Sequence, residues 1–213
     1  MNASLFRQSL HGTSMNRRIK ILQRKTVFER FIFRIDEVQL RHALYDGSMG
    51  EPITRLVLER GDSVAVLPHD PEAGVVLLCE QFRAPTVERG PGWLAEIPAG
   101  ILEAEEAVEA CAHRETLEET GHDVAAIARI ATVYPSPGGS SERIHILYGR
   151  ILLRPDAPKT AGVANEGEDI RILQTPVDAA LAQLRAGEIQ DAKTAIALQW
   201  LELAMLRGDI DGR

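Results

Sequence analysis

The chain has 213 residues, enough for one sizeable domain with a small appendage. Hydrophobic residues make up 45% of it and charged residues 26%, as in most globular proteins, and its formal net charge is −7. This acidic balance argues against a protein that coats nucleic acid, and no apolar run reaches the ~20 residues that a membrane span needs.

The first part of the chain predicts a basic arm followed by a small β subdomain. Residues 1–28 hold six Lys or Arg and no acid, a pattern that a transit peptide shares. We favour the interpretation of residues 1–18 as a flexible arm of a cytoplasmic protein. Residues 19–58 predict an antiparallel β subdomain, with strands at 20–28, 31–44 and 53–59 and a turn after Leu44.

Residues 59–207 predict a single larger domain, which opens with a hairpin. Its strands are expected at 62–70 and 74–83, and the continuous apolar run VVLLC indicates a strand covered on both faces. The two cysteines, Cys79 and Cys111, are isolated in apolar stretches. Without a disulfide framework, they indicate a reducing compartment.

A helix is predicted after the next loop, from about Ala104 to Thr120, with Gly121 as its C-terminal cap. Further strands are expected within 125–137, 143–153 and 170–174.

Two helices complete the predicted domain. Thr175 is expected to cap the first, with Pro176 in its first turn and Gly187 at its end. The second runs from Asp191 to about Leu206. Strands in the first half, flanked by later helices, predict an α+β or mixed-sheet sandwich.

Three glutamates in RETLEETG, namely Glu115, Glu118 and Glu119, lie at i, i+3 and i+4 with no lysine among them. On a helix, like charges at this spacing cost roughly 0.2–0.5 kcal/mol per pair, and they share one side. Converging carboxylate oxygens suit a hard divalent cation, Mg²⁺ or Mn²⁺. A solvated charged face is the alternative that spacing alone leaves open.

The whole stretch GILEAEEAVEACAHRETLEETGH resembles the signature of the Nudix hydrolases, which cleave nucleoside diphosphates linked to another moiety. All the polar and glycine positions of that pattern are present. Thr116 and His122 stand where the family usually has a bulky aliphatic residue, at sites that serve packing. The resemblance implies an α/β fold of the α+β kind, namely the Nudix α/β/α sandwich with a mixed β-sheet and an N-terminal antiparallel β subdomain.

The same resemblance implies a metal site at the predicted helix. Two or three Mg²⁺ ions would bridge to the pyrophosphate of the substrate. Glu106 and Arg114 would support the site by holding loop and helix together. The metal ligands implied are the Ala99 carbonyl, Glu115, Glu118 and Glu119.

Other stretches resemble the ADP-ribose pyrophosphatase branch of the family over roughly residues 19–206; they include LLCEQFRAP, WLAEIPAG, SPGGSSER, NEGEDIRI and GEIQDAKTAIALQWL. Pro137 lies 15 residues beyond His122, close to the marker proline of that branch. The branch implies Mg-dependent hydrolysis of ADP-ribose to AMP and ribose 5-phosphate by a homodimer that exchanges the N-terminal subdomain. Two alternatives remain: hydrolysis of another nucleotide sugar such as GDP-mannose, or a non-catalytic nucleotide-sensing module.

The branch also implies substrate contacts outside the acidic helix. Arg83 follows a buried strand and could grip phosphate oxygens with its planar guanidinium, although a structural ion pair is the alternative. Phe31 and Arg55, the latter from the partner subunit, would flank the adenine. Phe28, Phe33 and ordinary core packing compete with the assignment of Phe31.

The remaining implied residues lie in loops. Pro137 and Gly138 belong to a loop whose backbone could approach a ligand closely, and Glu142 would contact the terminal ribose. Glu96 would support a loop or serve as an outer metal ligand, with a plain charged loop residue as the alternative. Glu166 matches the catalytic base that the branch carries before its EDI element, with Glu168 as the second candidate.

Overall fold

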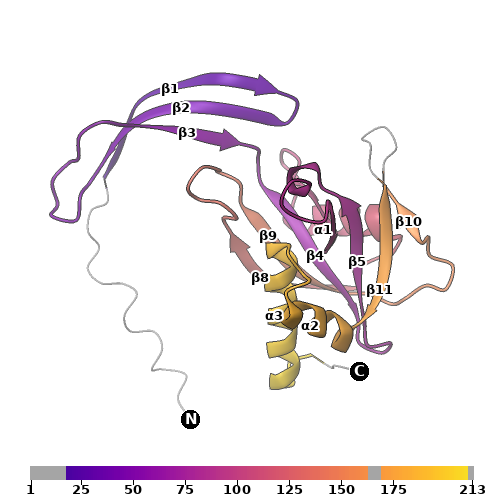
Figure 1. Cartoon of the computed structure of the whole chain (residues 1–213). Coiled ribbons are helices and arrows are strands. Elements are labelled where there is room, and N and C mark those ends of the chain that lie inside the picture. The colour runs from indigo at the N-terminus through magenta and orange to yellow at the C-terminus, as the bar shows by residue number, and fades with distance from the viewer. Residues whose placement is uncertain (1–17, 163–168, 211–213) are drawn as a thin grey trace, which may run out of the picture. The chain divides into compact units, whose positions relative to one another are not determined.

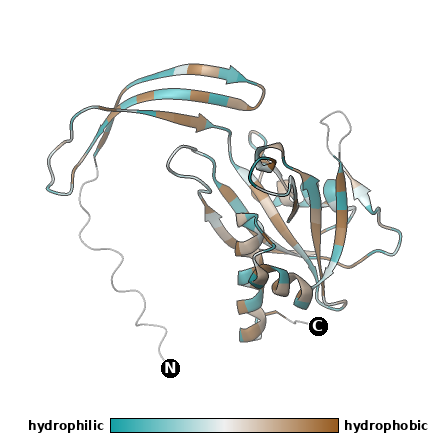
Figure 2. Cartoon of the chain, in the orientation of Figure 1, coloured by the Kyte–Doolittle hydropathy of each residue, from teal (hydrophilic) through white to brown (hydrophobic). Residues whose placement is uncertain are grey.

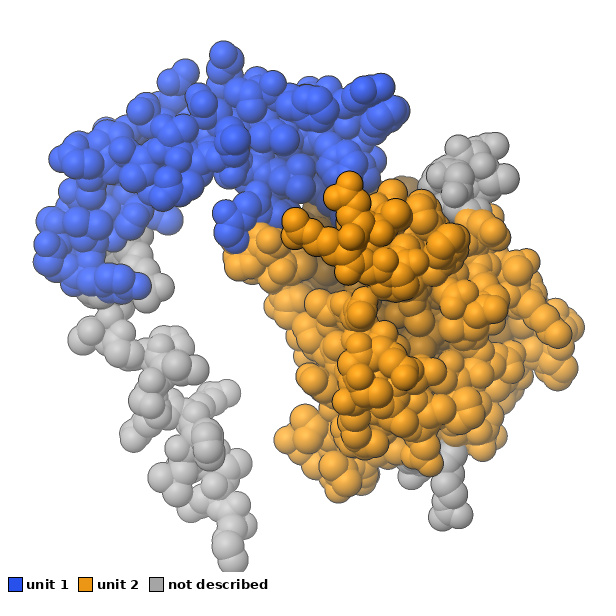
Figure 3. Space-filling view, in the orientation of Figure 1, with its two compact units in different colours: residues 1–60, 138–141 blue, residues 61–137, 142–213 orange. Residues whose placement is uncertain are grey.

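The structure, a computed structural model, describes residues 18–162 and 169–210. They form two compact units, drawn in blue and orange in Figure 3. Unit 1 holds the described residues up to Arg60 together with residues 138–141, and unit 2 holds the others. Within the described ranges, no helix is long and apolar enough to cross a membrane.

Unit 1 is a three-stranded antiparallel sheet in the order β1-β2-β3 (Figure 1), which confirms the predicted N-terminal β subdomain. Gly47 provides the positive φ of 85° in the turn before β3, and Asp46 accepts a hydrogen bond there from the Ser48 backbone N–H. Hydrophilic and hydrophobic residues alternate along these strands (Figure 2). The strands are β1 (Ile19–Arg30), β2 (Phe33–His42) and β3 (Ile53–Glu59).

Unit 2 is built on an eight-stranded mixed sheet. Its main path has the order β10-β11-β5-β4-β9-β8, while β6 pairs with β5 and β7 with β4. Only the pair of β4 and β9 is parallel among these described strands. The strands are β4 (Ser63–Asp70), β5 (Val75–Phe82), β6 (Trp93–Glu96), β7 (Ala99–Ile101), β8 (Ala126–Val133), β9 (Ile144–Arg150), β10 (Thr160–Ala161) and β11 (Ile170–Pro176).

Different helices cover the two faces of this sheet. Val64 and Val66 of β4 pack in one core cluster with Cys111 of α1, whereas Ala65 and Leu67 pack in another with α2 and α3. Since neighbouring residues of a strand point to opposite faces, the predicted α/β/α sandwich is confirmed. The helices are α1 (Val108–Thr120), α2 (Val177–Ala186) and α3 (Ala192–Arg207), and a 3₁₀ turn spans Ala84–Thr86.

Three local predictions differ from the structure. Helix α1 begins at Val108 and not near Ala104, because Glu105 has a left-handed φ of 64° that a helix cannot include. Thr175 does not cap α2, since it pairs with Val76 in β11 and Pro176 is the N-cap residue. The short strand β7 lies where a loop was expected, and the short strand β6 was not predicted, because three or four residues are too few to show an alternating pattern.

The predicted helix ends are confirmed. Gly121 and Gly187 close α1 and α2 with left-handed φ values of 71° and 76°. At the start of α3, the carboxylate of Asp191 accepts a hydrogen bond from the Thr194 backbone N–H at 2.9 Å. Thr116 and His122 are both fully buried, in line with the packing role expected of these positions.

Candidate active site

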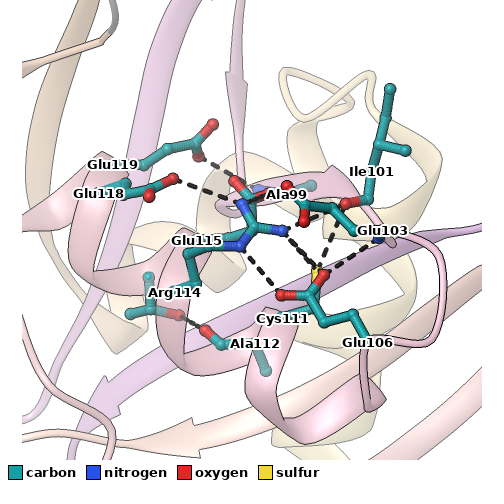
Figure 4. Close-up of polar contacts among 11 residues, drawn as sticks. Ala99, Ile101, Glu103, Glu106, Cys111, Ala112, Arg114, Glu115, Glu118 and Glu119 are labelled. Carbon is teal, nitrogen blue, oxygen red and sulfur yellow. Dashed lines mark hydrogen bonds and ion pairs between the residues drawn. The ribbon is translucent and has the colours of Figure 1, made fainter.

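The acidic cluster, which we define as Glu115, Glu118 and Glu119, lies on the side of α1 that meets β7 (Figure 4). Glu119 is buried and accepts a hydrogen bond from the Ala99 backbone N–H at 3.2 Å. The carboxylate of Glu115 lies against Gly100, where an added Cβ would come within 1.7 Å of Oε1. Glycine at this position therefore leaves the space that the carboxylate occupies.

Arg114 ties α1 to the loop that precedes it. Its Nε and Nη2 donate to the two carboxylate oxygens of Glu106, each at 3.0 Å, and Nη2 also donates to the Ile101 carbonyl at 3.3 Å. Its Nη1 donates to Glu115 at 2.6 Å and reaches the half-exposed Glu118 at 3.5 Å (Figure 4). Such a bidentate pair is both strong and directional, so it can hold the loop and the helix together.

Burial and pairing shift the pKa values of this region in opposite directions. The hydrogen bonds from Arg114 lower the pKa of Glu106 to about 2. Burial raises the pKa of Glu115, although Arg114 opposes this change. A cation placed beside Glu115 would favour its charged form and offset the effect of burial.

Replacing Glu106 with Gln is expected to make stability less sensitive to acid. The carboxyl has a pKa of about 2 in the folded chain and about 4.3 when unfolded, so the unfolded chain binds the proton more readily. The stabilisation is therefore complete above pH ~4.3 and is lost as the pH falls toward ~2. Tm measured from pH 7 to pH 3 should be lower for E106Q at pH 7 and should approach the wild-type value in acid. Parallel curves would contradict this, and E109Q, at an exposed glutamate of the same helix, is the control.

The residues of the acidic cluster fit a hard divalent cation by their chemistry. Carboxylate and carbonyl oxygens are the ligands that such ions take, and Gly100 gives Glu115 room beside β7. In this conformation Arg114 and the Ala99 N–H engage the carboxylates, and no three acidic, His or Cys side chains of residues 18–162 and 169–210 are grouped for metal binding. The side chains would have to turn from these partners to share an ion.

A second group of charges, the four-charge cluster of Arg83, Glu96, Asp191 and Lys193, lies where β5, β6 and α3 meet. Arg83 donates from Nε and Nη2 to the two oxygens of Glu96, at 2.8 and 3.1 Å. Lys193 donates from Nζ to Glu96 Oε2 and, at 2.9 Å, to Asp191. Burial acts to raise the pKa of Glu96, but the hydrogen bond from Arg83 and the charge of Lys193 outweigh it and lower that pKa.

The acidic cluster and the four-charge cluster interact electrostatically, as the pKa of Arg83 shows. Burial acts to lower the pKa of Arg83, but the bond to Glu96 and the charges of Glu96, Glu119 and Asp191 raise it overall. The structure thus places Arg83 in an ion pair beside the acidic cluster. Lys193 was missed as a site residue, although it stands in the stretch GEIQDAKTAIALQWL, two residues after the cap of α3.

The residues predicted to hold the adenine lie in unit 1. Phe31 is 88% exposed in the turn between β1 and β2, and the Arg30 guanidinium lies 5.1 Å from its ring centroid. Arg55 is exposed and pairs across the sheet with Val38, seven residues along from Phe31. At 3.3 Å per residue that separation is roughly 20 Å, so one chain does not bring Phe31 and Arg55 together.

The other predicted contacts lie in the segment between β8 and β9. Pro137 is exposed and belongs to unit 2, while Gly138 belongs to unit 1, where the neighbouring Gly139 carbonyl accepts a hydrogen bond from the Leu58 N–H at 2.8 Å. Glu142, in unit 2, accepts a hydrogen bond from the Ser63 hydroxyl at 3.2 Å. The candidate bases Glu166 and Glu168 lie outside the described residues.

Comparisons with known proteins find relatives that match most of this chain. The family model of the NUDIX domain matches residues 59–198. The chain is 36% identical over 189 residues to the ADP-ribose pyrophosphatase of Escherichia coli (strain K12), covering 87% of this chain and 88% of that protein. It is also 36% identical over 203 residues to the GDP-mannose pyrophosphatase of Cronobacter sakazakii, covering 92% of this chain and 100% of that protein. A solved structure described as an ADP compounds hydrolase is similar with a TM-score of 0.67 at 18% identity, over 90% of this chain and 96% of that one.

Proposed function

The chain belongs to the NUDIX domain family, and on that basis we propose that it hydrolyses the pyrophosphate of ADP-ribose to AMP and ribose 5-phosphate. The observation that carries this proposal is the acidic cluster, in which Glu115 packs against Gly100 and Glu119 is hydrogen-bonded to Ala99. Carboxylates grouped in this way are suited to bringing divalent cations to a diphosphate. Similar identity to GDP-mannose pyrophosphatases makes GDP-mannose the second candidate substrate.

Members of this family generally use divalent metal ions. We propose two or three Mg²⁺ ions here, with Mn²⁺ as a substitute, held by the Ala99 carbonyl and by Glu115, Glu118 and Glu119. When bound, such ions offset the charge of the pyrophosphate and make water more acidic. Arg114 and Glu106 hold the loop against α1, and the bond from Arg114 to Glu115 helps to orient that carboxylate.

Protein groups complete the proposed reaction. Glu166, or else Glu168, accepts the proton of the attacking water as general base. Arg83 donates hydrogen bonds to the phosphate oxygens of the bound substrate, an interaction made in the ground state and the transition state alike. Although Arg83 is paired with Glu96, its side chain is 40% exposed and the charge of Glu119 acts on it, which supports a place for Arg83 at the substrate phosphates.

The two ends of the substrate are assigned to residues outside these clusters. Phe31 and Arg55 flank the adenine in our proposal, since a ring and a guanidinium both stack well on a base. We further propose that Glu142 binds the terminal ribose and that Pro137 and Gly138 contribute backbone contacts to the substrate. Because Phe31 and Arg55 are far apart in one chain, the pair would have to come from two subunits.

We therefore propose a homodimer joined through unit 1. Large apolar side chains of its three strands are exposed in the single chain, among them Ile19, Ile21, Val27 and Leu56. Several exposed large apolar side chains on one small sheet indicate an interaction surface. Sedimentation should show a dimer that L56D weakens, and a monomeric wild type would refute the proposal.

A cytoplasmic location is also part of the proposal. Cys79 and Cys111 are both free and buried, which accords with a reducing compartment. Fractionation of source cells tests this location. Recovery of the protein outside the cytoplasm would contradict it.

A substrate panel tests the proposed activity directly. Product release from ADP-ribose, GDP-mannose and ADP-glucose should be measured with Mg²⁺, with and without a chelator. We expect the highest kcat/KM for ADP-ribose and loss of turnover with the chelator. A higher value for GDP-mannose would transfer the assignment to that substrate, and turnover that survives chelation would overturn the metal site.

Replacing Gly100 with Ala is expected to lower activity by about 10²-fold, the usual scale for a misplacement of about 1 Å in an active site. The new Cβ would overlap the Glu115 carboxylate, which must move away. Tm should change little, because the displaced atoms form the end of a flexible side chain. In an E115Q background G100A should have a much smaller effect, and equal effects in both backgrounds would contradict this explanation.

A further inference from the structure

We propose that Lys193 is a positioning residue that allows Arg83 to leave Glu96 and bind the substrate phosphates. This inference rests on the proposed function, and it adds a residue to which no role has been assigned above. The observation behind it is that two cationic side chains, Arg83 and Lys193, both donate to the buried carboxylate of Glu96.

The two cations differ in their freedom to move. The side chain of Arg83 is 40% exposed, whereas that of Lys193 is only 11% exposed. Lys193 is also held by Asp191, which caps α3. Arg83 is therefore the partner that can turn toward a ligand, and Lys193 is the one that stays.

The start of α3 is also fixed to the residue that follows β6, through hydrogen bonds that do not involve Arg83. The Thr194 hydroxyl accepts a hydrogen bond from the Ile97 backbone N–H at 2.8 Å and donates one to Asp191 at 2.6 Å. Thr194 is fully buried. These bonds hold the backbone of Lys193 next to Glu96 whether or not Arg83 is present.

Charge balance gives the physical reason for the second cation. The four-charge cluster is neutral, with two positive and two negative side chains. If Arg83 turns to a phosphate, Glu96 keeps Lys193 as its partner. Without Lys193, the same movement would leave a buried carboxylate unpaired, which is strongly unfavourable, so Arg83 would stay on Glu96.

The test is a double-mutant cycle on the kinetics of ADP-ribose hydrolysis, using wild type, K193M, R83A and R83A/K193M. K193M should raise KM by about 10-fold to 100-fold, the scale of one hydrogen bond to a charged group, and should change kcat by less than about 3-fold. K193R, which keeps the charge, should restore KM to near the wild-type value. In the R83A background the substitution at Lys193 should have little further effect on KM.

Two results would overturn the proposal: a wild-type KM for K193M, or an increase in KM that is equally large in the R83A background. R185M, which removes an exposed ion pair between α2 and α3, controls for general loosening of α3. If K193M does not fold, K193Q takes its place in the cycle. Failure of this proposal can be told apart from failure of the proposed function. If the wild type cleaves another nucleotide sugar instead of ADP-ribose, the same cycle is measured with that substrate.

Discussion

Replacing Glu119 with Gln is expected to lower kcat for ADP-ribose hydrolysis by about 10³-fold while the protein stays folded. A metal-bound charge contributes several kcal/mol to stabilising a phosphoryl transition state, and each 1.36 kcal/mol is about tenfold in rate. The side chain is buried beside Ala99, whose N–H donates to its carboxylate at 3.2 Å. The amide oxygen of Gln can accept the same hydrogen bond, so little stability should be lost.

The matched control is E109Q, which removes the same charge from an exposed position on the same helix. Its activity should stay within about 2-fold of wild type, since surface substitutions usually have small effects. Steady-state kinetics over a range of Mg²⁺ concentrations and a thermal melt would be recorded for both variants. Near-wild-type kcat in E119Q at saturating Mg²⁺ would refute the assignment of Glu119 as a ligand.

Replacing Glu166 with Gln is expected to reduce kcat by 10²–10⁴-fold, the usual contribution of a general base. Gln is close to Glu in size but cannot take a proton from water at neutral pH. If Glu166 acts only as the base, the affinity for Mg²⁺ should be unchanged, which distinguishes this variant from E119Q. Metal affinity measured by titration calorimetry, beside kcat, therefore separates the two roles.

Glu168 supplies the comparison for that experiment, because it lies two residues away in the same NEGED stretch. E168Q should retain most of the activity if Glu166 is the base. A larger loss of kcat in E168Q than in E166Q would transfer the role to Glu168. Small losses of kcat in both variants would show that neither Glu166 nor Glu168 is the general base.

Much of the fold was predictable from local sequence because its signals are short-range. The i, i+3, i+4 glutamates and the glycines that end α1 and α2 act within a few residues, and the structure has these helix ends where they were expected. The apolar run before Glu80 likewise predicted a strand covered on both faces, and β5 is such a strand. Glu105 was not predictable in this way, since helical propensity gives no warning of its positive φ.

The sequence by itself determined the family, the acidic cluster and the chemistry that oxygen ligands on one helix can support. Only the tertiary structure decided which groups meet across long separations. It placed Glu115 over Gly100 and brought Lys193 to Glu96 from 97 residues away. Contacts of this kind depend on how strands and helices pack, and no local pattern of residue types encodes which distant side chain will share a buried charge.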